Sequence, residues 1–560
     1  MPVPTSSRRL VPWCAALLAL AWLGLPARGG PDTFPQALVT ERVAREGYAR
    51  ILHVAPGGDD LKGDGSAQRP LASLPEAMER AGRPAEGARV AVLVASGHYL
   101  QPTLALKPRV DLFGGFSPDF AQRDLSIHLS SLTSPEGSRI LLGADDVRVD
   151  GFHLRDARVR GKGAAFLCDG VSPQVTHCVF TNNRTLTPAD WNPPYLHETA
   201  NDGGAIFCVN GAAPLIRGNV FYDNATECGR GAAVAADGGA APRLVGNVFA
   251  NNRAGLTDPM RSSDGGAVSF FGGSRGEISG NVVVGNEALT RNDAGGIFVA
   301  LWSAPVIRDN RVVANESGDD AGGLFLGGQE HRYDAPLDPY PPAAEFNILV
   351  ERNWFVGNAN GARNSGAMRI TMETRARFVE NVVTENAGGV YLQRSELDWE
   401  RNTLWQDWRF VEDKASLGPS RFTENVLLGP AGPVNARVSF VRNRAPADAP
   451  GGPHLPLPDR FVADGLRGEL SDLAFDRERG VTSLRTAAPL PAGVALAGRI
   501  VRVSDNPVRG GQWRVIARAS GREMVLWGRL DAVTKAPRHF EVLRSFTPAA
   551  PGAEAAPGSR

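Results

Sequence analysis

Lysine and cysteine are scarce in this chain of 560 residues, and its formal charges sum to zero. The 60 basic residues balance 60 acidic ones, which removes the electrostatic reason to expect nucleic acid or an anionic membrane surface as a partner. Arginine supplies nearly all of the basic side chains, since the only lysines are Lys62, Lys107, Lys162, Lys414 and Lys535. A mechanism that needs a lysine base therefore has few residues to draw on.

Long apolar runs are also missing beyond the N-terminus, so no segment after residue 30 is expected to span a bilayer. The run at 11–25 follows Arg8 and Arg9 and precedes small residues, which is the layout of a cleaved secretory signal. We therefore expect residues 1–30 to be a signal peptide. The mature protein is expected to be a secreted monomer, periplasmic or extracellular, without a membrane span.

Cysteine usage leaves the redox state open. Four cysteines follow the expected signal peptide, and they are Cys168, Cys178, Cys208 and Cys228. Export to an oxidising compartment would allow one or two disulfides, whereas burial as free thiols is the alternative. No Cys-x-x-Cys pair is present to suggest a zinc site.

Glycine and proline are abundant, at 64 and 41 residues, and they punctuate a repeat. The unit reads Asp, Gly or Ala, Gly, Gly or Ala, then alternating apolar residues, a turn and two Asn positions. The first Asn lies 17 residues after the Asp in the copy from Asp202 to Asn219, and copies starting at Asp264, Asp293 and Asn364 keep that separation. An insertion near 329–343 lengthens the copy that begins at Asp320.

Alternating apolar residues within each unit, such as Ile297 and Val299, predict short strands, not helices. Strands separated by turns and stacked coil on coil form a solenoid with continuous parallel sheets. The glycines suit sharp bends. The Asn residues suit turn positions that tolerate a left-handed backbone and that hydrogen-bond between coils, so we assign them a structural role.

Two segments carry a resemblance to known proteins. Residues 53–60, His-Val-Ala-Pro-Gly-Gly-Asp-Asp, continue through 69–74 and resemble the opening of pectate-lyase-like β-helix proteins. Residues 110–116 are similar to a motif of bacterial surface β-helix repeat proteins. The resemblance implies an all-β, right-handed parallel β-helix whose N-terminal end is capped by a helix. The apolar face of that helix would consist of Leu74, Ala77, Met78 and Ala81.

The expected organisation has four parts after the signal peptide. The β-helix covers 50–445, with the cap and first coils at 50–110, and a Pro- and Gly-rich linker follows at 446–458. Runs of β-branched and aromatic residues predict a small β-rich domain at 459–546. Residues 547–560, rich in Ala, Pro and Gly, are expected to be disordered.

An acidic register is the first candidate site. Asp264, Asp293 and Asp320 occupy one position of successive coils, so their carboxylates are expected about 4.8 Å apart in a row that suits Ca²⁺. The alternative is structural, because Asp before Gly commonly caps backbone amides in turns. The same position holds Arg230 in an earlier coil.

The resemblance to pectate lyases implies a calcium-assisted polysaccharide lyase with a Lys or Arg base. Since lysine is scarce, Arg230 and Arg369 are the candidate bases, and a salt bridge from either to the Asp row is the alternative. Asp319, together with Asp320 and Asp293, offers carboxylates for a glycoside hydrolase instead.

An aromatic row is the second candidate site. Outward positions of successive coils read Phe207, Ala235, Ser269, Phe298, Phe325, Arg369 and Tyr391. If these positions are exposed, their aromatic members would bind the flat faces of sugar rings, and they are Phe207, Phe298, Phe325 and Tyr391. The inserted loops would cover them in the alternative interpretation. The leading hypothesis is binding of a polysaccharide or glycan on this sheet without catalysis. Two other hypotheses remain. The first is a polysaccharide lyase or glycoside hydrolase, and the second is a structural envelope or adhesion protein.

Overall fold

A computed structural model describes most of the chain. The described residues are 38–191, 201–257, 263–289, 291–328, 346–361, 364–406, 408–411, 418–427, 438–444, 462–476, 481–494, 496–505, 512–527, 530 and 538–543. The predicted signal peptide (1–30), linker (446–458) and tail (547–560) lie outside these residues, as does the insertion near 329–343.

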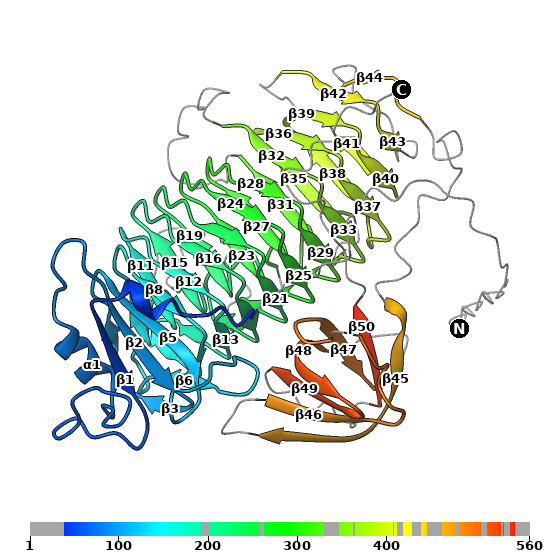
Figure 1. Cartoon of the computed structure of the whole chain (residues 1–560). Helices are drawn as coiled ribbons and strands as arrows, with labels where there is room; N and C mark the ends of the chain where they lie inside the picture. The colour runs from blue at the N-terminus through cyan, green and yellow to red at the C-terminus, as the bar shows by residue number, and fades with distance from the viewer. Residues whose placement is uncertain are drawn as a thin grey trace, which may run out of the picture.

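Short parallel strands stack into a solenoid across the described residues from Arg50 to Val441 (Figure 1). Its strands form four sheets, of 14, 12, 11 and 7 described strands, in which each strand pairs with the equivalent strand of the next coil. The 14-stranded sheet runs from β1 (Arg50–Val54) to β44 (Val438–Val441). The 7-stranded sheet runs from β10 (Arg158–Arg160) to β34 (Ala359–Asn360).

The 11-stranded sheet holds both predicted sites. Its strands are β4 (Leu104–Ala105), β7 (Leu141–Leu142), β11 (Phe166–Asp169), β15 (Ile206–Val209), β19 (Val234–Ala236), β23 (Val268–Phe270), β27 (Ile297–Ala300), β31 (Leu324–Gly327), β35 (Met368–Thr371), β38 (Val390–Gln393) and β41 (Trp408–Val411). The 12-stranded sheet runs from β3 (Gly97–Leu100) to β43 (Val426–Leu427). The predicted alternation holds, because Ile297 and Val299 both lie in the apolar interior of the solenoid. The prediction of an all-β parallel β-helix is confirmed.

Two ladders of buried asparagines connect the coils. Asn281 is representative: its amide nitrogen donates to the Leu244 carbonyl at 2.8 Å and to Asn310 Oδ1 at 3.0 Å. Its own Oδ1 accepts the backbone amide of Asn247 at 2.8 Å. The first ladder consists of Asn219, Asn247, Asn281, Asn310, Asn353, Asn381, Asn402, Asn425 and Asn443. The second consists of Asn183, Asn224, Asn252, Asn286, Asn315, Asn358 and Asn386, and Gln406 continues it.

The left-handed turn residue is not the ladder asparagine, which corrects the sequence-based assignment. Asp223, Asn251 and Glu385, with φ of 51°, 53° and 55°, each stand one position before a ladder residue. The left-handed residue turns the chain, and the next side chain then points inward to bond with its neighbours. Gly266 of the repeat is required for a different reason. A Cβ at this position would lie 2.4 Å from the carbonyl oxygen of Gly295 in the next coil, so there is no room for a side chain.

The N-terminal end is closed as predicted by helix α1 (Leu74–Ala81). Ser73 caps it by accepting the amide of Glu76 at 3.3 Å. The four apolar residues of its inner face, Leu74, Ala77, Met78 and Ala81, are all buried against the first coils. Among the described residues, no helix has both the length and the apolar character required to cross a membrane.

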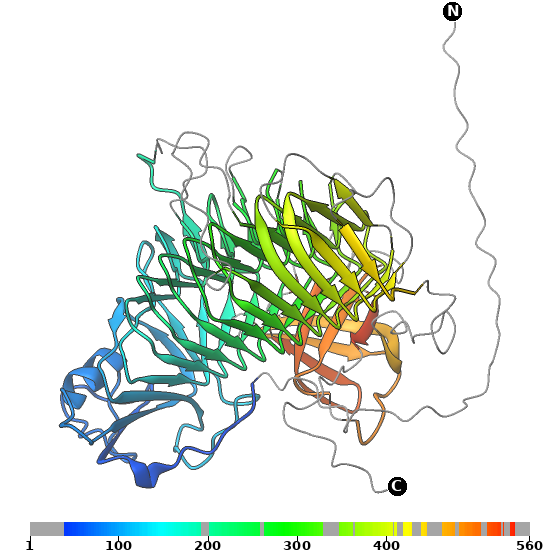
Figure 2. The same ribbon diagram turned by 90° about the horizontal axis from the view of Figure 1, so that it is seen from above.

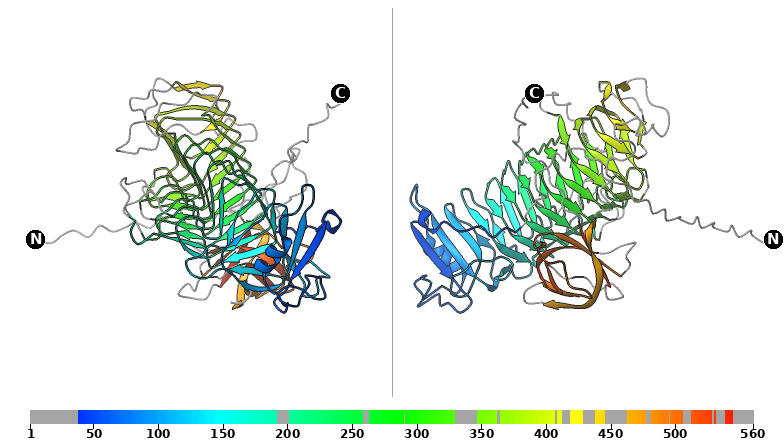
Figure 3. Two further views of the ribbon diagram at one scale, coloured as in Figure 1. Left: turned by 90° about the vertical axis from the view of Figure 1, so that its left-hand side faces the viewer. Right: turned by 45° about the vertical axis from the view of Figure 1, so that its right-hand side comes forward.

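A closed antiparallel barrel follows the solenoid. Its strands are β45 (Val462–Asp476), β46 (Val481–Thr486), β47 (Ile500–Ser504), β48 (Gln512–Ser520), β49 (Glu523–Trp527) and β50 (His539–Leu543). Figures 1, 2 and 3 show it in orange and red against the flank of the middle coils. Its outer face packs on the 12-stranded sheet in one buried apolar cluster that includes Val220, Val248, Val515 and Trp527.

Polar contacts fix the docked position of the barrel. The Arg514 guanidinium is fully buried and donates to Asp223 Oδ2 of the solenoid at 2.9 Å. The Asn251 amide donates to the Trp513 carbonyl at 2.6 Å. Separating the barrel from the solenoid would leave the Arg514 charge without its partner, which is unfavourable for a buried ion pair. The pair therefore stabilises the docked position.

Cys168, Cys178, Cys208 and Cys228 are free thiols in the structure, and all four are buried. Of the two alternatives left open by the sequence, the structure therefore has the unoxidised one. Burial raises the pKa of Cys178 to about 12, which keeps this thiol protonated at neutral pH.

Replacing a ladder residue is expected to destabilise the solenoid strongly. Asn281→Ala leaves the Leu244 carbonyl and the Asn247 amide without their partners in the interior, at a cost of about 3 kcal/mol. The free energy of unfolding, measured by urea titration with circular dichroism, checks this value. Gln174→Ala, which removes an exposed amide on β12 (Gln174–Thr176), is the control and should change stability by less than about 0.5 kcal/mol. Equal effects of the two substitutions would contradict a stabilising role for the ladder.

Candidate functional site

The outward column of the 11-stranded sheet has the order read from the sequence. Strand pairing places Phe298 beside Phe325, Phe325 beside Arg369, and Arg369 beside Tyr391. The column continues to Arg409 on β41. The spacing of the repeat thus correctly predicted which residues are neighbours in this column. The prediction holds although the number of residues between one strand of the sheet and the next differs from coil to coil.

The prediction of an exposed aromatic strip is wrong for three of its four aromatic members. The Phe298 and Phe325 rings stack with centroids 5.2 Å apart, yet the residues are only 1% and 2% exposed. They pack with Ala294, Ala321 and Met372 in a separate buried cluster. Phe207 is 3% exposed and lies under the Lys162 ammonium group, 4.9 Å from its ring centroid. These rings stabilise the outside of the sheet and leave no face for a sugar.

Tyr391 is the aromatic member that stays partly exposed. Its ring is flanked by two cations, with Arg369 Cζ at 4.1 Å and Arg409 Cζ at 5.9 Å from the centroid. Arg369 also donates to Gln393 Oε1 at 3.2 Å, and Arg409 is exposed. The C-terminal end of the column therefore combines an accessible ring with guanidinium groups.

The acidic register also exists, and its members are linked through the main chain. The amide of Asp293 donates to Asp264 Oδ1 at 2.8 Å, and the amide of Asp320 donates to Asp293 Oδ1 at 3.0 Å. The carboxylates of Asp264 and Asp293 therefore each accept a backbone hydrogen bond from the next coil, whereas the Asp320 carboxylate accepts from the Ser365 hydroxyl at 3.3 Å. The role is structural, as in the alternative to metal binding, but the amides that are bound belong to the next coil and not to the local turn.

Cations accompany the acidic register at both ends. Lys162 Nζ lies 2.6 Å from Asp202 Oδ2, and Arg230 Nε lies 4.0 Å from Asp264 Oδ2. Arg369 reaches Asp320 Oδ1 at 3.3 Å. The arginines named as candidate bases thus stand next to the Asp row as partners in ion pairs, and Arg230 is only 4% exposed. An Arg in that setting is suited to carrying a fixed positive charge.

Asp293 lies between two other carboxylates. Burial, followed by the charges of Asp264 and Asp320, raises the pKa of Asp293 well above its ordinary value. Burial likewise raises the pKa of Asp320, although the Arg369 charge opposes that shift. Asp319, the third hydrolase candidate, is exposed, and its carbonyl accepts a hydrogen bond from Asn360 at 2.6 Å.

The Asp row does not fit a calcium ion. Ca²⁺ needs its ligands within about 2.6 Å of one point, and among the described residues Asp264, Asp293 and Asp320 do not form a group with three ligand atoms within 4.8 Å of one another. In the part of the chain that is described, the group with three ligand atoms within 4.8 Å of one another is Glu41, Asp150 and His177. The predicted metal site at Asp264, Asp293 and Asp320 is therefore corrected to a ladder.

The group of Glu41, Asp150 and His177 was not found from the sequence, because its members come from three separate coils or segments. His177 Nδ1 lies 3.0 Å from Asp150 Oδ2 and its Nε2 lies 3.7 Å from Glu41 Oε1. Three arginines already neutralise the two carboxylates, namely Arg123, Arg148 and Arg217. That charge balance disfavours a divalent cation.

Asp150 is fully buried within this group. Burial alone would raise its pKa, but the His177 hydrogen bond and the charges of Arg123 and Arg148 outweigh burial and hold the pKa well below its usual range. The ionised carboxylate is therefore the stable form. Glu41 connects the N-terminal segment to Arg148 of β8 (Arg148–Asp150) at 2.7 Å, so the network fastens that segment to the solenoid.

The raised pKa of Asp293 predicts a pH-dependent stability. The folded state binds a proton that the unfolded state releases near the ordinary carboxyl pKa, so this contribution to stability is complete at low pH. This contribution of Asp293 to stability is lost as pH rises through its folded-state pKa. The loss in the free energy of unfolding is about 1.4 kcal/mol for each unit by which folding raises the pKa. Asp293→Asn keeps an oxygen for the Asp320 amide and removes the charge, so at pH 7 it should unfold at higher urea than the parent. Asp398→Asn, at an exposed position, is the control. A destabilised Asp293→Asn variant at pH 7 would refute the assignment.

Comparison with known proteins agrees with the geometry. Residues 140–330 match the family model described as a right handed beta helix region. No curated protein matches the chain. The matched residues include β7 to β31, and the parallel pairing continues on both sides of them. The chain is a right-handed parallel β-helix repeat protein with a small C-terminal β barrel.

Proposed function

We propose that this protein binds an acidic polysaccharide, without catalysis, at the C-terminal end of the 11-stranded sheet. The observation that carries the proposal is the column of Arg369, Tyr391 and Arg409 on three adjacent strands. A partly exposed ring between two guanidinium groups offers an apolar edge and a hydroxyl group to a sugar, and the guanidinium groups offer donors for its carboxylate.

The contacts that residues of the Asp row and its arginine neighbours already make support binding over turnover. Arg230 and Asp264 are 4% and 3% exposed, and the Asp264 carboxylate is occupied by the Asp293 amide. Arg369 is engaged by Asp320 and Gln393 and stacks on Tyr391. These contacts suit a group that holds a charged ligand in place, and they make a poor general base.

Gel electrophoresis in polygalacturonate tests the proposal. The parent protein should be retarded relative to its mobility in a gel containing neutral dextran. The Tyr391→Ala, Arg409→Ala double variant should bind the acidic polymer about tenfold more weakly or worse, because it loses the contacts of the tyrosine side chain and a charge-assisted contact, worth about 1.4 kcal/mol or more together.

Arg421→Ala is the matched control. Arg421 is an exposed arginine on β42 (Ser420–Thr423) of the 14-stranded sheet, so its removal changes the net charge by the same unit away from the column. Its retardation should stay within twofold of the parent. Equal losses for Arg409→Ala and Arg421→Ala would mean that charge alone causes retention, and no retardation of the parent would favour a structural envelope protein; either result refutes the proposal.

A further inference from the structure

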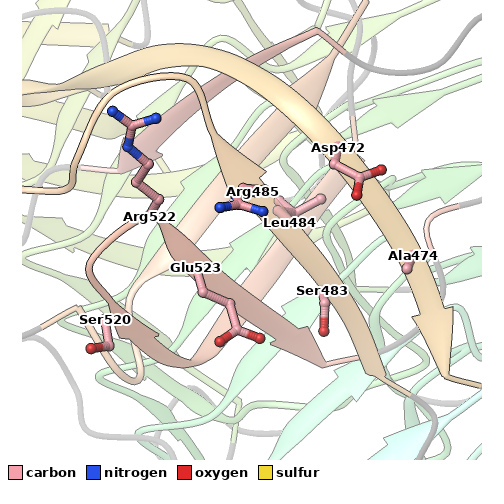
Figure 4. A pocket seen from close by; sticks show the side chains of 8 residues that line it. All are labelled: Asp472, Ala474, Ser483, Leu484, Arg485, Ser520, Arg522 and Glu523. Carbon is pink, nitrogen blue, oxygen red and sulfur yellow. The ribbon is translucent and has the colours of Figure 1, made fainter.

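The barrel has a cavity of its own, of about 370 Å³, on its outer face (Figure 4). Polar residues of β45, β46 and the turn from β48 to β49 line it, and they are Asp472, Ser483, Arg485, Ser520, Arg522 and Glu523. The volume falls within the range of small-molecule sites, which is about 300–1,000 Å³.

Strand register brings the charged residues together. Arg485 of β46 pairs with Asp472 of β45 on one side and with Glu523 of β49 on the other. Leu484 and Met524, the neighbours of Arg485 and Glu523, point into the barrel core, so Arg485 and Glu523 point outward. Figure 4 shows Asp472, Arg485 and Glu523 among the side chains that line the cavity.

The cavity lies beyond the contact with the solenoid on the same barrel face. Outward residues further along these strands, Val481 of β46 and Val525 and Trp527 of β49, are buried against the 12-stranded sheet. Asp472, Arg485 and Glu523 are exposed. Docking therefore leaves this part of the face accessible, and it fixes the direction in which the cavity opens relative to the solenoid.

The charged groups of the cavity are available to a ligand. Within the described residues, Arg485, Arg522 and Glu523 form no ion pair within 4.0 Å, although register sets opposite charges side by side. Asp472 makes a local contact through Oδ1, which accepts the Leu473 amide at 2.8 Å. Guanidinium groups bind carboxylates through paired hydrogen bonds, and carboxylates and serine hydroxyls bind sugar hydroxyl groups.

We propose that this cavity is a second saccharide site, which binds a carboxylate-bearing sugar through Arg485 and Arg522 and its hydroxyl groups through Asp472 and Glu523. The class of ligand rests on the proposed function, whereas the location rests on the barrel alone. The protein would then hold one acidic chain at two separate places, one on the solenoid and one on the barrel.

Titration calorimetry of the full chain with trigalacturonate, an oligomer short enough to occupy one site, tests this inference. The parent should bind two equivalents. The Arg485→Ala, Arg522→Ala variant should bind one, and so should the Tyr391→Ala, Arg409→Ala variant. Arg467→Ala, an exposed substitution on β45 outside the cavity, should still bind two. Circular dichroism confirms that each variant keeps its fold.

The outcomes separate the two proposals. One equivalent in the parent, retained by the Arg485→Ala, Arg522→Ala variant, overturns the barrel site and leaves the solenoid site standing. One equivalent that this variant loses, and that the Tyr391→Ala, Arg409→Ala variant keeps, overturns the solenoid site and supports the barrel site. Absence of binding by the parent overturns both.

Discussion

Hydrogen-bonded stacking of each coil on the next is the constraint on which the rest of the structure depends. Buried asparagines such as Asn281 bond to the coils on both sides of their own, which leaves no tolerance for a shift of register. Residues that are 18 to 43 positions apart in sequence therefore become neighbours in the first asparagine ladder. The chemistry of the surface follows from those columns, whether the members are rings, carboxylates or arginines.

The register of the repeat could be predicted from the sequence because backbone geometry demands its signature residues. Gly266 has no room for a Cβ, and the ladder asparagines each satisfy several buried groups. Burial could not be predicted in the same way. Phe298 is covered by residues such as Met372, which lies at a position that the repeat does not specify. The hydrogen bond from the Asp293 amide to the Asp264 carboxylate depends on how one coil stacks on the next, which the repeat does not specify either. The barrel docks on Tyr222 and Val248, and no sequence pattern common to the barrel and the solenoid indicates that these two surfaces meet.

Buried charge in this protein serves mainly to join segments. Asp150 is held ionised by Arg123, Arg148 and His177, and it anchors the chain that precedes the first coil. The acidic register alternates with cations at Lys162 and Arg230 before three acids follow in succession. Groups that look catalytic in a sequence are thus committed to internal contacts. Accessible polar groups with aromatic or cavity surroundings are found at Tyr391 and on the barrel.

The docked barrel has a mechanical consequence for the solenoid. Within the solenoid, each coil contacts only the coils next to it. The barrel contacts strands from several layers at once, through Val179, Val220, Val248 and Val282, and Arg514 pins it to Asp223. The barrel therefore joins coils that do not touch one another within the solenoid, since β13 (Val179–Thr181) and β25 (Val282–Val284) both contact it and are separated by two strands of their sheet.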